Sequence, residues 1–422
     1  MTASHRPQPP NLSVNAQRLW DTIMETAEIG KTAKGGIKRL TLTDLDRQVR
    51  DWFISAAKEA GCSVVIDQMG NIFATRPGRN NELPAVACGS HLDTQPTGGK
   101  FDGILGVLAG LELIRTLNDV GYDTEAPVMV VNWTNEEGSR FAPAMVSSGV
   151  YAGAFDLDYA YDRTDRDGVR LGDALAEIGY RGELPVGNQP IGSFFELHIE
   201  QGPILEAESK AIGVVTGAQG TRWYDVSITG RESHAGTTPM DMRFDALAAA
   251  AELTLTVERI AKEQSPPGVG TIGEVVITEP SRNVVPGKVA ITIDMRHPQA
   301  GALAAMDQAM RDAASKIASN RSLGVEVEEI WYSPPLEFDP DCVALVRAAA
   351  ERQGGGHREI VSGAGHDACY LSRVVPTAMV FVPCKDGISH NEIEHAEFDD
   401  CAAGANVLMQ AMLARANASV DE

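Results

Sequence analysis

The chain has 422 residues, with 36 basic and 58 acidic side chains, which gives a formal net charge of −22. Such a chain lacks the clustered Lys and Arg that neutralise phosphates, so we expect no nucleic-acid partner. No window approaches the ~20 consecutive apolar residues of a membrane span, and the first ten residues lack the apolar core of a signal peptide. We therefore expect a cytoplasmic protein with no membrane partner, built from two or three domains.

The six cysteines are spread along the chain, and none of them forms a CxxC pair. This distribution is typical of reduced thiols in a reducing compartment, so we expect no disulfide.

The first half of the chain alternates buried strands with a helix. Residues 84–89 form an apolar run typical of a buried strand, and apolar residues then recur at helical spacing from 104 to 117. A second apolar run follows at 128–133. This β-α-β rhythm predicts an α/β fold in which a mostly parallel sheet carries helices on both faces. Two further runs are candidate strands of the same sheet, 193–199 and 377–382.

The pattern changes between about Gly220 and Pro335, where the order of elements becomes β-α-β-β-α-β. That order is typical of a ferredoxin-like α+β sandwich. We therefore expect an inserted domain of residues 220–335 within a larger domain of residues 1–219 and 336–422. The expected elements of the insertion are strand 222–229, helix 243–264, strands 269–278 and 288–294, helix 300–319 and strand 325–332.

Four polar clusters lie where a parallel sheet places its active site, just past the carboxyl ends of predicted strands. Any one of them alone is more often a solvated loop, but their joint position favours a shared site. They carry three His and several carboxylates, within residues 90–103, 134–138, 196–203 and 386–391.

Imidazoles and carboxylates that converge on one crevice suit Zn²⁺, and the carboxylate oxygens also admit Mn²⁺ or Co²⁺. Five ligands exceed the three protein ligands usual for one catalytic zinc, so we expect two metals that share a bridging carboxylate. Glu136 and Glu137 are adjacent and cannot both point at the same metal. One of the two should bind metal while the other acts as general base.

Seven longer motifs extend these clusters along the chain. They are GSHLDTQPTGGKFDGILGVLAGLE, TNEEGSRFAP, ELHIEQGP, SHAGTTPM, RNVVPGKV, DMRHP and SGAGHDA. These motifs resemble the hydantoinase/carbamoylase amidase subfamily of the dinuclear-zinc M20 peptidase superfamily, and the similarity spans about residues 15–415. This subfamily contains N-carbamoyl-L-amino acid hydrolases, β-ureidopropionases and allantoate amidohydrolases.

The resemblance implies two divalent metal ions per subunit, Zn²⁺ first, with Mn²⁺, Co²⁺ or Ni²⁺ as alternatives. It also implies that residues 1–219 and 336–422 form the metal-binding catalytic domain and that residues 220–335 form a lid or dimerisation domain. The implied roles are Asp102 as bridge, Glu137 and His390 at one metal, His91 and His198 at the other, Glu136 as general base, and Asp93 as the carboxylate that orients His91.

By the same resemblance, His234 stabilises the oxyanion across the interface of a homodimer. Asn283 and Arg296 bind the substrate, because the planar Arg fork suits a carboxylate. Gln201 contacts the ureido group and the Gly365 backbone contacts the carboxylate. Four other histidines lack such support and are expected to be non-ligands: His5, His297, His357 and His395.

The expected activity is hydrolysis of an N-carbamoyl-L-amino acid to the amino acid, ammonia and CO2. A β-ureidopropionase or an allantoate amidohydrolase would use the same mechanism, because all three substrates present a ureido group and a carboxylate.

Three other classes of protein are disfavoured. A thiol hydrolase could use Cys369 or Cys384, but no Cys-Glu-Lys constellation is apparent. A non-catalytic binding module would not need the full ligand set together with Glu136. An aminopeptidase or deacylase of the superfamily usually has a carboxylate at the position of His198, and Gln201 also argues against that class.

Overall fold

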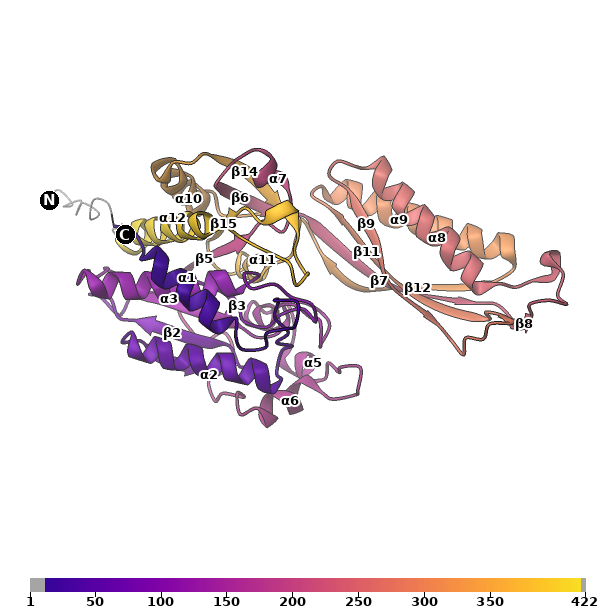
Figure 1. The fold of residues 1–422 in the computed structure, drawn as a ribbon, viewed down its shortest axis with the longest axis horizontal. Coiled ribbons are helices and arrows are strands. Elements are labelled where there is room, and N and C mark those ends of the chain that lie inside the picture. Colours follow the sequence, from indigo (N-terminus) through magenta and orange to yellow (C-terminus); the bar gives the residue numbers. More distant parts are fainter. Residues whose placement is uncertain (1–11, 419–422) are drawn as a thin grey trace. The chain divides into compact units, whose positions relative to one another are not determined.

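The computed structural model describes residues 12–418, which form two compact units (Figure 1). The first unit comprises the described residues up to Gly217 together with those from Glu337 onward, and the second is Ala218–Leu336. The first unit is therefore discontinuous in sequence, and each unit has its own sheet and its own helices.

The first unit is built on a nine-stranded mixed sheet. Its central pairs, β4 with β3, β3 with β5 and β5 with β15, are parallel. Antiparallel pairs flank this centre on both sides, because β2 runs against β4 and β6 runs against β15. The strand order is β1 (Ser63–Ile66), β2 (Ile72–Arg76), β4 (Val128–Trp133), β3 (Ala85–His91), β5 (Ile191–Ile199), β15 (Thr377–Val382), β6 (Ile212–Ala218) and β13 (Leu336–Glu337), with β14 (His357–Ser362) also paired to β6.

Helices cover both faces of this sheet. On one face, a Cβ added at Gly404 of α12 (Phe398–Ala416) would lie 2.7 Å from Leu197 of β5. Phe194, an odd number of residues before Leu197, points to the opposite face, since side chains alternate along a strand. There its ring packs on Trp133, which in turn packs on Tyr151 of α4 (Val146–Tyr151).

No helix among residues 12–418 combines the length and the apolar character needed to cross a membrane.

The other helices of this unit include α3, which directly follows the loop of Asp102. The remaining helices are α1 (Ala16–Thr26), α2 (Asp44–Glu59), α3 (Ile104–Asp119), α5 (Leu157–Tyr161), α6 (Leu171–Glu177), α7 (Ile204–Ala207), α10 (Pro340–Gln353), α11 (Asp367–Leu371) and the 3₁₀ turn η2 (Lys385–Gly387).

The predicted fold class is confirmed, and the buried strands are the best-predicted elements. The runs at 128–133 and 377–382 coincide with β4 and β15, and the helix expected from residue 104 is α3. The antiparallel strands β1, β2 and β6 at the margins of the sheet were not predicted, although β2 and β6 are mostly buried.

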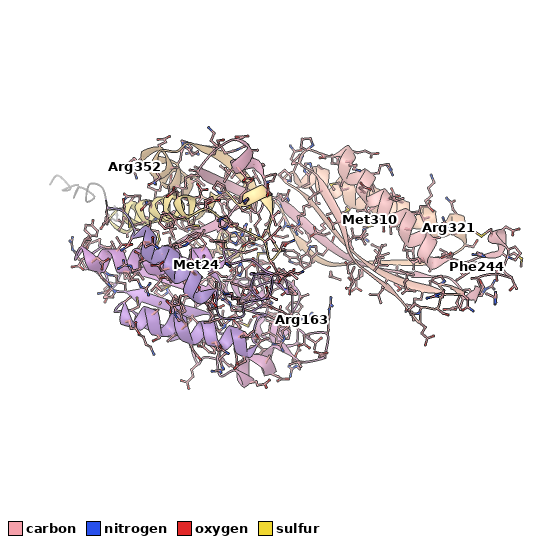
Figure 2. All side chains as sticks on the ribbon, viewed as in Figure 1. Met24, Arg163, Phe244, Met310, Arg321 and Arg352 are labelled. Atoms are coloured by element: carbon pink, nitrogen blue, oxygen red, sulfur yellow. The ribbon has the colours of Figure 1, made fainter. Side chains whose placement is uncertain are left out.

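The second unit is a four-stranded antiparallel sheet in the order β12-β7-β11-β9, with two helices packed on it. Met310 lies in its apolar core and is fully buried (Figure 2). Two short strands pair beside the sheet. The elements are β7 (Gly220–Thr229), β8 (Ser233–His234), η1 (Met240–Met242), α8 (Ala246–Glu263), β9 (Val269–Ile277), β10 (Val284–Val285), β11 (Lys288–His297), α9 (Ala300–Arg321) and β12 (Gly324–Ser333).

Candidate metal centre

Two histidines lie where the parallel strands of the first unit end. His91 is the last residue of β3, and His198 is the last but one of the neighbouring parallel strand β5. Glu136 and Glu137 follow β4, the strand on the other side of β3. All four side chains are buried, with at most 9% exposed. These four side chains therefore lie at the edge of the sheet where the strand pattern predicts an active site.

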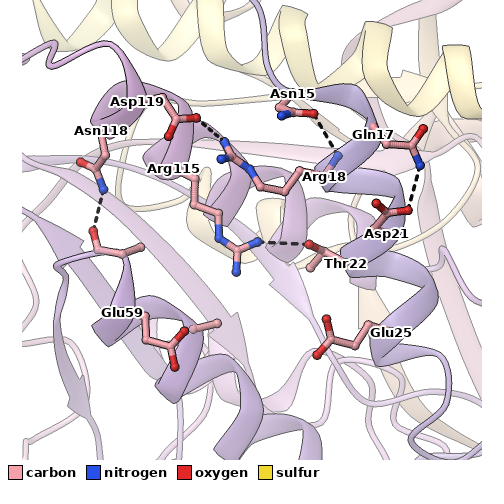
Figure 3. A pocket seen from close by; sticks show the side chains of 12 residues that line it. Asn15, Gln17, Arg18, Asp21, Thr22, Glu25, Glu59, Arg115, Asn118 and Asp119 are labelled. Atoms are coloured by element: carbon pink, nitrogen blue, oxygen red, sulfur yellow. Dashed lines mark hydrogen bonds and ion pairs between the residues drawn. The ribbon is translucent and has the colours of Figure 1, made fainter.

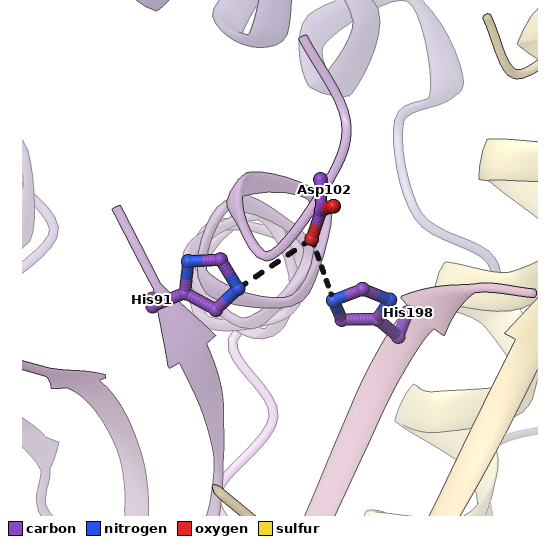
Figure 4. A group of neighbouring side chains, drawn as sticks. All are labelled: His91, Asp102 and His198. Carbon is purple, nitrogen blue, oxygen red and sulfur yellow. Dashed lines mark ion pairs between the residues drawn. The ribbon is translucent and has the colours of Figure 1, made fainter. Parts of the chain in front are cut away.

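Asp102 lies between the two imidazoles, immediately before α3 (Figure 4). Its Oδ1 is 3.2 Å from Nε2 of His198 and 3.6 Å from Nε2 of His91. Gly103, the next residue, has φ +68 and approaches His91 so closely that an added Cβ would overlap the imidazole. Both the backbone conformation and the close approach require glycine at this position.

The second oxygen of Asp102 faces a second group of ligands. Oδ2 is 3.4 Å from Nε2 of His390, and this nitrogen is 3.5 Å from Oε2 of Glu137. Two groups of side chains have ligand atoms close enough together to hold a metal ion. One group is His91, Asp102 and His198, and the other is Asp102, Glu137 and His390. One carboxylate is thus shared by two sets of potential metal ligands.

The hydrogen bonds of the imidazoles show that the centre fits a cation. Nδ1 of His91 lies 2.8 Å from the carbonyl oxygen of Asp93, and Nδ1 of His198 lies 2.9 Å from that of Ile199. A carbonyl oxygen only accepts, so each Nδ1 donates, and in the neutral imidazole each Nε2 carries a lone pair that faces the centre. Lone pairs that face carboxylate oxygens repel one another unless a cation or protons lie between them.

The charges of the centre lead to the same conclusion. Among residues 12–418, the ion pairs of Asp102, Glu136 and Glu137 within 4.0 Å are all with imidazoles. Burial, with repulsion from Asp367, raises the pKa of Glu136 well above its ordinary value, and burial also raises the pKa of Glu137. Buried acids without Lys or Arg partners are stabilised by a metal ion.

The adjacent glutamates reach different partners, as their expected division of roles requires. Oε2 of Glu136 lies 3.4 Å from Nε2 of His91, beside the first set of ligands. Glu137 accepts hydrogen bonds from both the backbone and the side chain of Gln95, at 3.0 and 2.7 Å, and faces His390. Glu137 is thereby fixed at the second set.

The expected contact between Asp93 and His91 takes a different form in the structure. The carboxylate of Asp93 was expected to orient His91, but its Oδ1 lies 3.9 Å from Nδ1, and the backbone carbonyl takes the near position. That carboxylate instead accepts a hydrogen bond from the backbone N–H of Glu136, at 3.4 Å, and burial raises its pKa to about 7. Gln201, expected at the ureido group, donates to Asp102 Oδ2 at 2.7 Å.

Two buried residues beside the centre had no role in the sequence analysis: His366, which it missed, and Glu196, which it named only as part of a polar cluster. His366 lies with its ring 4.5 Å from that of His198, and its Nε2 is 3.0 Å from Ser362 Oγ. Glu196 accepts hydrogen bonds from Ser90 Oγ and from the backbone of Ala368. A third group of side chains that could hold a metal ion consists of Glu196, His198 and His366. The spacing of Glu196 and His198 along one strand, i and i+2, was the available signal.

Three predicted residues of the substrate pocket belong to the second unit: His234, Asn283 and Arg296. Gly365 belongs to the first unit. His234 is exposed on β8, which pairs with β10, and the backbone N–H of Ala235 donates to the carbonyl of Asn283 at 2.9 Å. Arg296 on β11 forms a fork with Asp294, in which Nε and Nη2 donate to its two oxygens at 2.9 and 2.7 Å. The Arg fork is thus already engaged by a carboxylate of its own strand.

The residues expected to stand outside the site include three described histidines. His297 accepts a hydrogen bond from the backbone N–H of Gln299, and His395 packs on Trp20 and Phe101. None of His297, His357 and His395 belongs to the three groups of potential metal ligands found among residues 12–418. His5 lies outside the described residues. The six cysteines are unpaired and buried.

A pocket of about 700 Å³ opens elsewhere on the first unit, between α1, α2 and α3 (Figure 3). In it Arg18 pairs with Asp119 and Arg115 donates to Thr22 Oγ1. None of the predicted site residues lines this pocket.

The chain belongs to Peptidase family M20/M25/M40, whose model matches residues 87–414. An N-carbamoyl-L-amino-acid amidohydrolase of Rhizobium meliloti is 51% identical over 96% of this chain and 97% of its own length. The crystal structure of a hydantoinase/carbamoylase family amidase from Burkholderia vietnamiensis covers 98% of this chain and is itself matched over 100% of its length, with 57% identity and a TM-score of 0.95. A ureidoglycolate hydrolase of Arabidopsis thaliana is 33% identical over 94% of this chain and 86% of its own length. The resemblance found in the motifs is confirmed.

Proposed function

We propose that this chain is a metal-dependent amidohydrolase that cleaves the carbamoyl C–N bond of N-carbamoyl-L-amino acids. One water is consumed, and the products are the amino acid, ammonia and CO2. The observation that carries the proposal is the contact of Asp102 with the imidazoles of both ligand sets. The Rhizobium meliloti relative, matched over nearly its whole length, supports the substrate class.

In this proposal, His91 and His198 hold one divalent cation, Glu137 and His390 hold a second, and Asp102 contacts both. Zn²⁺ suits this set of nitrogen and oxygen donors, with Mn²⁺, Co²⁺ or Ni²⁺ as alternatives. When bound, such a pair polarises the substrate carbonyl and makes water acidic enough to attack near neutral pH.

Glu136 is the proposed general base. It is buried beside His91 and accepts no hydrogen bond from Lys or Arg among the described residues. A carboxylate in such a site can take the proton of the attacking water and return it to the leaving nitrogen. Burial raises the pKa of Glu136 well above its ordinary value, which favours uptake of the proton by its carboxylate.

His234 is the proposed oxyanion donor, acting across the interface of a homodimer. Its Nδ1 accepts hydrogen bonds from the backbone N–H groups of Gly236 and Thr237, at 3.0 and 3.2 Å. Since Nδ1 accepts, Nε2 carries the proton and can donate to a developing negative charge. Asn283, which precedes Val284, the partner of His234 in the β8–β10 pair, and Arg296 are the proposed substrate ligands of the same unit.

Gln201 and the Gly365 backbone complete the proposed pocket, at the ureido group and the carboxylate respectively. Gln201 is already directed at the centre through its contact with Asp102. The fork of Arg296 is engaged by Asp294, so a substrate carboxylate would compete with that ion pair or bind beside it. We also propose a cytoplasmic location, because the six buried thiols are unpaired.

The test is a substrate panel with the metal-reconstituted protein, monitored by ammonia release. The panel contains N-carbamoyl-L-α-amino acids, N-carbamoyl-β-alanine, allantoate and ureidoglycolate, because the Arabidopsis relative is named for the last compound. We expect the α-amino acid derivatives to react fastest. Faster turnover of N-carbamoyl-β-alanine or allantoate would establish the β-ureidopropionase or allantoate alternative, and no ammonia from any compound would overturn the proposal.

A further inference from the structure

One buried carboxylate joins two loops that carry metal-site residues from distant parts of the sequence. Oε1 of Glu394 accepts hydrogen bonds from the backbone N–H groups of Phe101 and Asp102, at 3.1 Å each. Oε2 of Glu394 lies 3.0 Å from the hydroxyl of Ser389, which is also 2.9 Å from Oδ2 of Asp102. Glu394 is only 4% exposed.

The packing around Glu394 is as close as its hydrogen bonds. A Cβ added at Gly99 would lie 2.1 Å from Oε1 of Glu394. The carboxylate therefore lies directly against the backbone of the loop that ends in Asp102. Such an approach leaves the loop little freedom to move away from Glu394.

The ligands of the two metal positions differ in how their backbones are held. His91 and His198 belong to strands in the middle of the sheet. His390 lies outside any helix or strand, has φ +55, and its side chain is 51% exposed. Its carbonyl oxygen accepts a hydrogen bond from Thr97 Oγ1 at 3.3 Å. The placement of His390 therefore depends on the contacts that join its loop to the loop of Asp102.

We propose that Glu394 is a positioning residue that holds the His390 loop against the Asp102 loop and thereby sets the metal affinity of the Glu137–His390 position. The inference rests on the two-metal site proposed above. Glu394 contacts the backbone of Asp102 and the hydroxyl of Ser389, and it acts on the metal through these groups. Partners of this kind typically change metal affinity by about 10- to 100-fold.

The experiment is a Zn²⁺ titration of chelator-stripped full-length protein by calorimetry, with metal content after dialysis as a second readout. Wild type should bind two equivalents. Glu394→Ala should bind one equivalent at wild-type affinity and the second about 10- to 100-fold more weakly. Glu394→Gln should bind the second equivalent more tightly than Glu394→Ala, because its amide oxygen still accepts both backbone N–H groups.

Glu392→Ala is the matched control, since Glu392 lies on the same loop and forms an ion pair with the exposed Lys34 at 3.4 Å. It should bind both equivalents like wild type. Two equivalents at wild-type affinity in Glu394→Ala would overturn the inference, and so would equal weakening of both equivalents, which indicates a general loss of structure. Fewer than two equivalents in wild type would overturn the two-metal site itself, and the inference with it.

Discussion

Gly103 lies against the face of His91, so that a Cβ added at Gly103 would be 2.3 Å from Nε2 of the imidazole. Gly103→Ala should therefore displace His91 and weaken metal binding by at least about tenfold, as loss of a ligand's support typically does. Metal titration measures this change. Gly121→Ala is the control, because Gly121 has a similar φ of +60 and nothing within 4 Å of an added Cβ. If both variants weaken metal binding equally, backbone strain and not the displaced imidazole is the cause.

Glu136→Gln should abolish turnover and leave metal content unchanged. Glutamine keeps the size of the side chain but cannot take a proton, and loss of a positioned base typically costs about 10²- to 10⁴-fold in kcat. Steady-state ammonia release and metal analysis of the same preparation check the two halves of the prediction. A variant that keeps more than a tenth of wild-type kcat would assign the base to another group.

Thiol-alkylating reagents should leave activity intact at pH 8. Burial raises the pKa of both Cys369 and Cys384 to about 12. Since pH 8 lies well below this pKa, each thiol is protonated at pH 8. Since the thiolate is the reactive form, alkylation should be slow until the protein unfolds. A chelator should remove activity under the same conditions, and added Zn²⁺ should restore it. Inactivation by alkylation at full metal content would favour the thiol mechanism.

The free energy of unfolding should depend strongly on Arg50 and weakly on Arg47, although both lie on α2. Arg50 pairs with Asp46 at 2.8 Å, with both side chains fully buried, and also donates to the carbonyl of Gly70. Arg50→Ala leaves a buried charge unpaired and should cost about 3–5 kcal/mol. The side chain of Arg47 is 41% exposed, so Arg47→Ala should leave the free energy of unfolding nearly unchanged. Denaturant unfolding of the two variants measures both values.

The centre of the fold and the polar clusters of the candidate site could be predicted from the sequence because their signals are local. The apolar runs of β4 and β15 identify buried strands by themselves, and the polar residues that follow strand ends indicate a site. His366 and Glu394 could not be found in this way. Their importance arises from contacts with His198 and with the backbone of Asp102, which no spacing along the chain reveals.

The orientation of individual side chains was also beyond the sequence. The backbone carbonyl of Asp93, and not its carboxylate, is the nearer oxygen to Nδ1 of His91. The fork of Arg296 is taken by Asp294, two residues away on the same strand face. Both outcomes depend on backbone geometry that a residue pattern leaves open.

The place of β15 between β5 and β6 has a consequence for biosynthesis. Both neighbours of this strand precede the second unit in the chain, whereas β15 follows it. During translation the sheet therefore stays open along its middle until nearly the whole polypeptide has left the ribosome, and His390 emerges later still. A nascent chain that lacks these segments can neither close the sheet nor bring His390 to Asp102.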